Sequence, residues 1–352
     1  MCSTYRHSAI RLWTFGKLIS ILVLAIIGIC ITGLSHADEP VRPKTDYSEV
    51  GAAINETMRA YHYNPAELDT PEYRRIEAAV TELADAATSD ETFMKGFRGI
   101  WENGPFSHVE INVAQQSADD LANYLDKMRI GGGGALLAWQ DDVAVLTVST
   151  MMGLDTIEEI DTAYAEIAKR ETSALIIDLR ENGGGAFAIL PLVSHLLAKP
   201  VDAGSFVSQP WNAVHNREPN RADLEAVDPW QGWSIKTFWA DVQTDPLTRI
   251  SFLPTEPVFD GPVYVLTSKR TASAAELAID ALKGANRAII IGENTAGEML
   301  SQKIYDLPGG LQLSLPIADY YSAVNGRIEG VGIKPDIVTD AADAFDIALK
   351  QL

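Results

Sequence analysis

The spacing of apolar residues changes along this 352-residue chain, and the change limits the folds open to it. From about Tyr47 to Arg129, apolar residues recur every three or four positions, which is the period of an α-helix. The run Gly131–Gly134 interrupts this pattern, and beyond it apolar strand-like segments alternate with amphipathic ones. The sequence therefore predicts a mostly helical N-terminal region at 38–130, followed by an α/β domain at 131–352.

The α/β region has a regular order of elements with one interruption. Strands are expected at 135–139, 143–148, 173–179, 263–267, 287–291 and 311–316, and helices at 156–169, 186–197, 274–283 and 341–352. Thr156 is expected to cap the first of these helices. The segment 202–256 holds four tryptophans and several prolines with little periodicity. We expect an irregular insertion there, either a functional loop beside a cleft or a surface segment packed around its own aromatic side chains.

The first 37 residues have the pattern of a secretory signal peptide. Basic residues precede an apolar run at 18–34, and Ser35-His36-Ala37 follows as a small-x-small cleavage site. We expect cleavage after Ala37 and export to the periplasm or the cell exterior. The alternative is an uncleaved N-terminal membrane anchor, which would be the protein's one contact with a membrane.

Composition excludes several classes of partner and site. The chain has 48 acidic and 28 basic residues and a formal charge of −20, whereas a nucleic-acid-binding protein needs a basic face. Both cysteines, Cys2 and Cys30, lie in the predicted signal peptide. The rest of the chain therefore has no thiol nucleophile and no thiolate ligands for a metal or an iron–sulfur cluster. No residue pattern indicates an oligomeric state.

A serine lies where an apolar strand meets an apolar helix, in the sequence Thr271-Ala272-Ser273-Ala274-Ala275-Glu276. A serine at such a junction is exposed, and the first amides of the helix point at whatever binds there. Small neighbours leave room for a substrate carbonyl group. The alternative interpretation is that Ser273 merely caps the helix.

A glycine-rich turn, Asp178-Leu179-Arg180-Glu181-Asn182-Gly183-Gly184-Gly185, follows the buried strand at 173–179. Its free amides could form an oxyanion hole, which stabilises the negative charge of a transition state. A phosphate cradle is a competing use, but the Lys-Ser/Thr pair of a P-loop is missing. A third interpretation is a plain turn held by a pair between Asp178 and Arg180.

These two motifs resemble those of the C-terminal processing (tail-specific) serine peptidase family. Two further segments agree: Gly292–Gly297 is similar to the family's glycine turn, and Glu329–Asp336 (EGVGIKPD) is similar to its near-terminal motif. The resemblance covers about residues 135–345. It implies a β/α core of the crotonase and ClpP type, a peptide or unfolded-protein substrate, and no cofactor or metal.

One departure from the family is chemically important. In the processing branch a lysine 25 residues after the serine activates it, but this chain has Glu298 at that position. Lys303 lies farther along an expected strand and is a poor substitute. Among the other candidate bases, His195 is expected in the core, and His62 and His215 in polar loops.

His108 and the preceding Ser107 instead resemble the branch that contains the tricorn core and retinoid-binding-protein-like modules. That resemblance assigns Ser273 as nucleophile and His108 as general base. Ser107 would orient the histidine, and Glu329 would supply the negative end of the hydrogen-bonded chain. The oxyanion donors would be the amide of Ala274 and one amide among those of Gly183, Gly184 and Gly185.

The resemblance also leaves alternatives open. Only about 70 residues separate His108 from Asp178, which leaves no room for the PDZ domain of the processing proteases. The favoured prediction is an exported serine peptidase that works through an acyl-enzyme on Ser273. A binding module for an apolar ligand or peptide on the same fold, and a coenzyme-A-using crotonase-type enzyme, are the alternatives.

Overall fold

The computed structural model describes residues 45–352. The predicted signal peptide or anchor at 1–37, with both cysteines, lies outside the described residues. Within them, no helix combines the length and the apolar character that crossing a membrane requires.

Six strands form a mainly parallel sheet in the order β12-β8-β7-β4-β3-β2. Neighbouring strands run parallel throughout, except that β2 pairs antiparallel with β3. The strands are β2 (Ala135–Gln140), β3 (Val143–Val148), β4 (Ala174–Asp178), β7 (Val263–Thr267), β8 (Ile289–Gly292) and β12 (Ile337–Val338). The first five of these strands agree with expected strands, whereas β12 was not expected.

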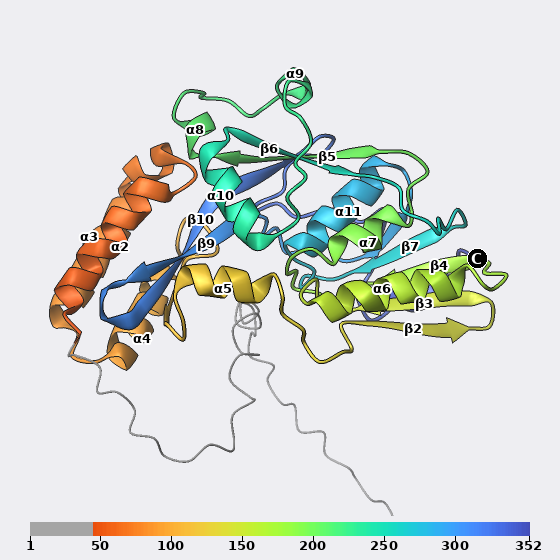
Figure 1. Cartoon of the computed structure of the whole chain (residues 1–352), viewed down its shortest axis with the longest axis horizontal. Helices are drawn as coiled ribbons and strands as arrows, with labels where there is room; N and C mark the ends of the chain where they lie inside the picture. The colour runs from red at the N-terminus through yellow and green to blue at the C-terminus, as the bar shows by residue number, and fades with distance from the viewer. Residues whose placement is uncertain (1–44) are drawn as a thin grey trace, which may run out of the picture. The chain divides into compact units, whose positions relative to one another are not determined.

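Helices cover both faces of this parallel sheet. On one face, α6 (Leu154–Ile167), α7 (Ile189–Ser194) and α11 (Ala274–Gly284) lie side by side (Figure 1). The other face packs against α12 (Ala344–Leu349). Leu175 and Ile177 of β4 belong to the first core and Ile176 to the second, and all three are fully buried. Covering both faces explains why β4 is a continuous apolar run.

A second, antiparallel sheet is built around the long strand β10. Its central order is β1-β10-β5-β6, and β9 and β11 also pair with β10. The strands are β1 (Glu110–Val113), β5 (Val201–Ser208), β6 (Leu247–Phe252), β9 (Ser301–Leu307), β10 (Leu311–Ser322) and β11 (Gly326–Arg327), with the short 3₁₀ turn η3 (Pro308–Gly310) between β9 and β10.

The N-terminal region is mostly helical, and α2 and α3 lie side by side in it (Figure 1). Its elements are α2 (Tyr47–Tyr61), η2 (Pro65–Asp69), α3 (Pro71–Ala86), α4 (Asp90–Trp101) and α5 (Ala118–Leu125). The strand β1 is the exception and joins the antiparallel sheet. The helices α2, α3 and α4 share one core with β9 and β10, in which Phe93 and Leu313 are fully buried, whereas Ala122 of α5 belongs to the core of the parallel sheet. The helical region thus brings β1, and the residues just before it, onto the antiparallel sheet.

The prediction of an irregular insertion at 202–256 is wrong. This segment contains most of β5, all of β6, and the helices α8 (Gln209–Asn212), α9 (Arg221–Glu225) and α10 (Ile235–Thr244). Trp230 and Trp239 are buried in the main core, and Trp211 in a small cluster with Val207 and Leu247. Most of the tryptophans therefore serve to attach this segment to the domain.

The prediction that Thr156 caps α6 is also wrong, because the helix begins at Leu154 with Gly153 as its N-cap. Asp155 lies in the first turn of α6 and holds this end of the helix in place. Its carboxylate accepts hydrogen bonds of 2.8–3.0 Å from the amides of Ile130, Gly131 and Gly132. The glycine run thus closes around the first turn of α6, and the Thr156 hydroxyl donates to the carbonyl of Met152.

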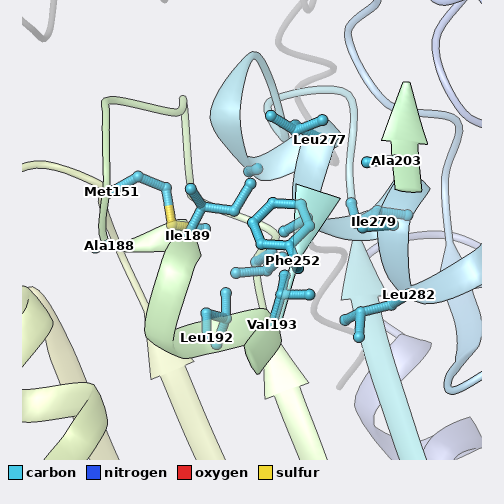
Figure 2. Close-up of a cluster of buried hydrophobic side chains, with 14 of the residues drawn as sticks. Met151, Ala188, Ile189, Leu192, Val193, Ala203, Phe252, Leu277, Ile279 and Leu282 are labelled. Atoms are coloured by element: carbon cyan, nitrogen blue, oxygen red, sulfur yellow. The ribbon is translucent and has the colours of Figure 1, made fainter. Parts of the chain in front are cut away.

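The core beneath α7 and α11 fixes the position of the loops above it. Figure 2 shows Ile189 and Val193 of α7 next to Phe252 of β6, in the core cluster that also contains Leu192 of α7 and Leu282 of α11. Burial of a side chain of this size stabilises the fold by about 1.5–3 kcal/mol. Because α11 is anchored along its length in this way, the residue that precedes its first turn has a fixed place.

Candidate active site

Three loops meet at the carboxyl ends of adjacent parallel strands. The glycine loop (Gly183–Gly185) follows β4, Ser273 lies six residues after β7, and the turn with Thr295 and Gly297 follows β8. Because β4, β7 and β8 are neighbours in one parallel sheet, their carboxyl ends lie at the same edge. Crevices at this edge are the usual ligand sites of open α/β sheets.

The backbone of Ser273 differs from that of the helix-capping serines in the same protein. Ser89, Ser117 and Ser234 cap helices with extended backbones, and each accepts a hydrogen bond from the amide three residues later. Ser273 instead has φ 54° and ψ −122°, which is strained for a residue with a Cβ atom. Such a strand-to-helix turn is typical of an exposed nucleophilic serine. The helix-cap interpretation does not account for this conformation.

Glu276, in the first turn of α11, stabilises that conformation. Its fully buried carboxylate accepts a 3.0 Å hydrogen bond from the amide of Ser273. It also accepts hydrogen bonds of 2.6–3.0 Å from the Thr295 hydroxyl and the amides of Gly297 and Glu298. Burial raises the pKa of Glu276, and these four donors oppose the rise. One carboxylate therefore joins the loop after β7 to the turn after β8.

The glycine loop lies directly against Ser273. A Cβ atom added to Gly184 would stand 2.7 Å from Cβ of Ser273 and 2.8 Å from the carbonyl oxygen of Ala272. The side chain of Asn182 holds the loop, because its Oδ1 accepts a 2.8 Å hydrogen bond from the amide of Gly184. The amide of Gly184 is therefore not available as an oxyanion donor. Among residues 45–352, the amides of Gly183, Gly185 and Ala274 have no acceptor. These three amides remain the candidate donors.

Gly184→Ala is expected to destabilise the protein by about 2–4 kcal/mol. Gly184 has a φ of 95°, which is strained for alanine, and the added Cβ atom would meet backbone atoms of 272–274 that cannot move aside. Gly133→Ala is the matched control: its φ is 83°, but nothing described lies within 4 Å of the added Cβ atom. Urea unfolding of both variants separates the two contributions. Equal losses of stability would contradict the close packing of Gly184 on Ser273.

Ser107, His108 and Glu329 form a hydrogen-bonded chain. The Ser107 hydroxyl donates to Glu329 Oε1 at 2.8 Å and lies 2.6 Å from Nδ1 of His108. A hydroxyl has one proton, so a serine that donates to the carboxylate must accept from the histidine. Nδ1 therefore carries the ring proton, and Nε2 keeps a lone pair. His108 also has a strained backbone, with φ 62°.

Four consecutive amides join the serine half of the site to the histidine half. The amides of Gly297 and Glu298 donate to Glu276, which holds Ser273. The next two amides, of Met299 and Leu300, donate to Glu329 Oε2 at 2.6 and 3.1 Å. The segment 297–300 therefore fixes the relative position of the two carboxylates.

The pKa of His108 is lowered by burial, and the charge of Glu298 acts in the opposite direction. A lowered pKa keeps the imidazole neutral near pH 7, as a general base requires. Among the described residues, no hydrogen bond joins Nε2 of His108 to the hydroxyl of Ser273. Such contacts often form only when substrate is bound.

The other candidate bases lie elsewhere. Lys303 donates to Gln243 of α10, and His195 is buried between Asp161 and the carbonyl groups of Thr255 and Pro257. His215 stacks on a tryptophan with a 3.8 Å centroid separation.

His62 was expected in a polar loop, but it is fully buried against Phe106. Burial lowers its pKa to about 4. The expected pair of Asp178 and Arg180 is confirmed, with contacts of 2.6 and 2.9 Å. Among residues 45–352, no group of three or more histidine or acidic side chains could hold a metal ion.

Two features of the site were missed in the sequence. Glu276 and Asn182 carry out their roles through backbone amides, which leave no pattern of side-chain types. The fixed spacing of Glu276 from Ser273 was visible, but nothing in it indicated three further donors from the turn after β8.

Comparison with known proteins extends these observations. Peptidase family S41 matches residues 142–339, more than half of the chain. The chloroplast C-terminal processing peptidase of Tetradesmus obliquus is 27% identical over 190 residues, which cover 53% of this chain and 33% of that protein. The chain thus spans about a third of the length of that relative.

Two solved structures share the fold. A lipoprotein from Streptococcus agalactiae aligns with a TM-score of 0.57 at 15% identity, over 91% of this chain and 99% of that one. The photosystem II D1 C-terminal processing protease aligns with a TM-score of 0.53 at 15% identity, over 84% and 94%. The predicted family and fold class are confirmed: the chain belongs to peptidase family S41.

Proposed function

We propose that this protein is a serine peptidase that cleaves peptide bonds through an acyl-enzyme on Ser273, with His108 as general base. The observation that carries the proposal is the hydrogen bond from Ser107 to Glu329. It requires the tautomer of His108 in which Nε2 can accept a proton. A histidine prepared in this way, in the same site as a strained serine, is the arrangement that serine hydrolases use.

In the proposed reaction, the Ser273 hydroxyl attacks the carbonyl carbon of the substrate while Nε2 of His108 takes its proton. The resulting oxyanion accepts hydrogen bonds from the amide of Ala274 and from the glycine loop, through Gly183 or Gly185. His108 then gives its proton to the leaving amine, and the acyl-enzyme remains. Water then attacks the acyl-enzyme while Nε2 of His108 takes its proton, and His108 returns a proton to the Ser273 oxygen as the carboxylic acid product leaves.

The proposed substrates are peptides or unfolded segments, which the match to peptidase family S41 supports, and aromatic side chains near the glycine loop are candidates to contact them. Trp233 packs against Phe187, two residues beyond the loop, with ring centroids 5.9 Å apart. Both side chains are half-buried. We further propose that the protein acts after export, on the basis of the signal-like pattern at residues 1–37.

The proposal is tested with an unstructured peptide library and a fluorophosphonate probe, both read by mass spectrometry. We expect new peptide ends and a covalent label on Ser273, and neither in Ser273→Ala. Cleavage that persists in Ser273→Ala would refute the assignment of the nucleophile. A folded wild-type protein that neither cleaves nor labels would favour the binding-module alternative.

The proposal also predicts a pH dependence. The base must be neutral, so kcat/KM rises as pH rises through the pKa of His108. Because burial lowers that pKa from 6.5, the half-maximal rate is expected below pH 6.5. Rates measured from about pH 4 to about pH 9 with a peptide free of titrating groups would show this. A midpoint above 6.5 would contradict the effect of burial.

A further inference from the structure

Glu298 occupies a central place in the proposed active site. Its amide donates at 3.0 Å to the same oxygen of Glu276 that accepts the amide of Ser273. The next amide along the chain donates to Glu329, which holds Ser107. The backbone of Glu298 is therefore fixed between the carboxylate that orients the nucleophile and the one that orients the base.

The side chain of Glu298 has no partner to balance its charge. It is half-buried, and among residues 45–352 it makes no hydrogen bond and no ion pair. It lies close enough to His108 to raise the pKa of that histidine against the effect of burial. Burial also raises the pKa of nearby Glu110, Arg98 lowers it, and the charge of Glu298 adds to the rise.

A half-buried carboxylate without a partner has lost part of its hydration. A cation that binds beside it recovers that loss and gains a charge-assisted hydrogen bond. Arg98 is the cation that acts on Glu110, and it makes no ion pair with Glu298. Within the described residues, no lysine or arginine side chain pairs with Glu298, so a basic side chain of a substrate can do so.

We propose that Glu298 is a specificity-determining residue that binds a lysine or arginine side chain of the substrate. This inference rests on the proposed peptidase function. His108 protonates the leaving amine. The backbone of Glu298 is directly followed by the amide that holds Glu329 in the histidine chain, so we place Glu298 on the leaving-group side of the cleaved bond. The preferred cation is therefore expected within the first residues after that bond.

The test compares wild type with Glu298→Gln and Glu298→Lys on matched peptides that carry lysine, glutamine or glutamate after the cleaved bond. Glu166→Gln, on α6, is the control for the loss of one negative charge. All rates are measured well above pH 7, where His108 is neutral in every variant. The effect of the substitution on the histidine is thereby removed from the comparison.

We expect wild type and Glu166→Gln to prefer the lysine peptide by about 10- to 100-fold in kcat/KM. Glu298→Gln is expected to lose that preference, and Glu298→Lys to prefer the glutamate peptide. Equal loss on all three peptides, or no preference in wild type, would overturn the proposal.

Binding of the same peptides to Ser273→Ala, with and without Glu298→Gln, is measured in parallel by fluorescence anisotropy. This measurement needs no turnover. Cleavage that depends on Ser273 without a charge preference refutes the role of Glu298 alone. Absence of cleavage together with a Glu298-dependent preference in binding refutes the peptidase and keeps the cation site.

Discussion

His108→Gln is expected to lower kcat/KM by roughly 10⁵- to 10⁶-fold, the scale seen when the base of a serine protease triad is removed. Glutamine has no nitrogen that can accept the proton of Ser273, although it can still occupy the space of the imidazole. The measurement is cleavage of one mapped peptide, with circular dichroism and urea unfolding to show that the variant is folded.

The double variant His108→Gln/Ser273→Ala provides the control for this prediction. Residues that act as one catalytic unit give losses that do not add. We therefore expect the double variant to be no slower than Ser273→Ala alone. A loss of less than tenfold in His108→Gln would remove His108 from the mechanism, and a multiplied loss in the double variant would show that the two residues act separately.

Glu329→Gln is expected to lower kcat by about 10³- to 10⁴-fold, on the scale of an exchange that imposes the wrong histidine tautomer. The amides of Met299 and Leu300 need an acceptor, so the glutamine oxygen must face them. Its NH₂ group then points at Ser107, which must accept from it and donate to Nδ1 of His108. The ring proton moves to Nε2, and the base is lost.

Two readouts distinguish this tautomer effect from a general loss of structure. The urea midpoint should fall only slightly, because the introduced glutamine would still accept both amide hydrogen bonds. Ser107→Ala removes the hydroxyl but does not reverse the direction of the hydrogen bond to Nδ1 of His108, so it should lose less activity than Glu329→Gln. If Glu329→Gln retained wild-type kcat, the hydrogen-bonded chain through Ser107 would not set the state of His108.

Sequence patterns predicted the parallel sheet well because its strands are covered on both faces. β4 and β7 are continuous apolar runs, and the helices after them, α7 and α11, are buried along most of their length. The junction that carries Ser273 follows directly from these two elements. The family motifs then suggested which loops meet there, and the matched region agrees with them.

The antiparallel sheet was harder to predict for a physical reason. Both faces of β5 are buried from Ala203 to Ser208, but small or polar residues fill several of these positions, so the strand shows neither a continuous apolar run nor a regular apolar alternation. Small residues are needed there because a Cβ atom on Gly204 would stand 2.2 Å from the carbonyl oxygen of Tyr321. The segment therefore resembled an irregular loop.

The candidate site was only partly accessible to sequence analysis. Ser107, His108 and Glu329 came from resemblance, and the structure brings these three together. The proximity of Glu298 to His108 and the four amides of 297–300 depend on how the two sheets meet. Such contacts between backbone and buried carboxylate leave no periodic trace in a sequence.

The hydrogen bond between Ser107 and Glu329 spans 222 positions of the chain. A ribosome that adds 5–20 residues per second needs roughly 10–45 seconds to travel that distance. During that interval the nascent chain already has its histidine, and later its serine, but lacks the oxygen that sets the ring proton. In a partly synthesised chain the proposed base therefore has no carboxylate to fix its tautomer, so the proposed activity requires the C-terminal part of the chain.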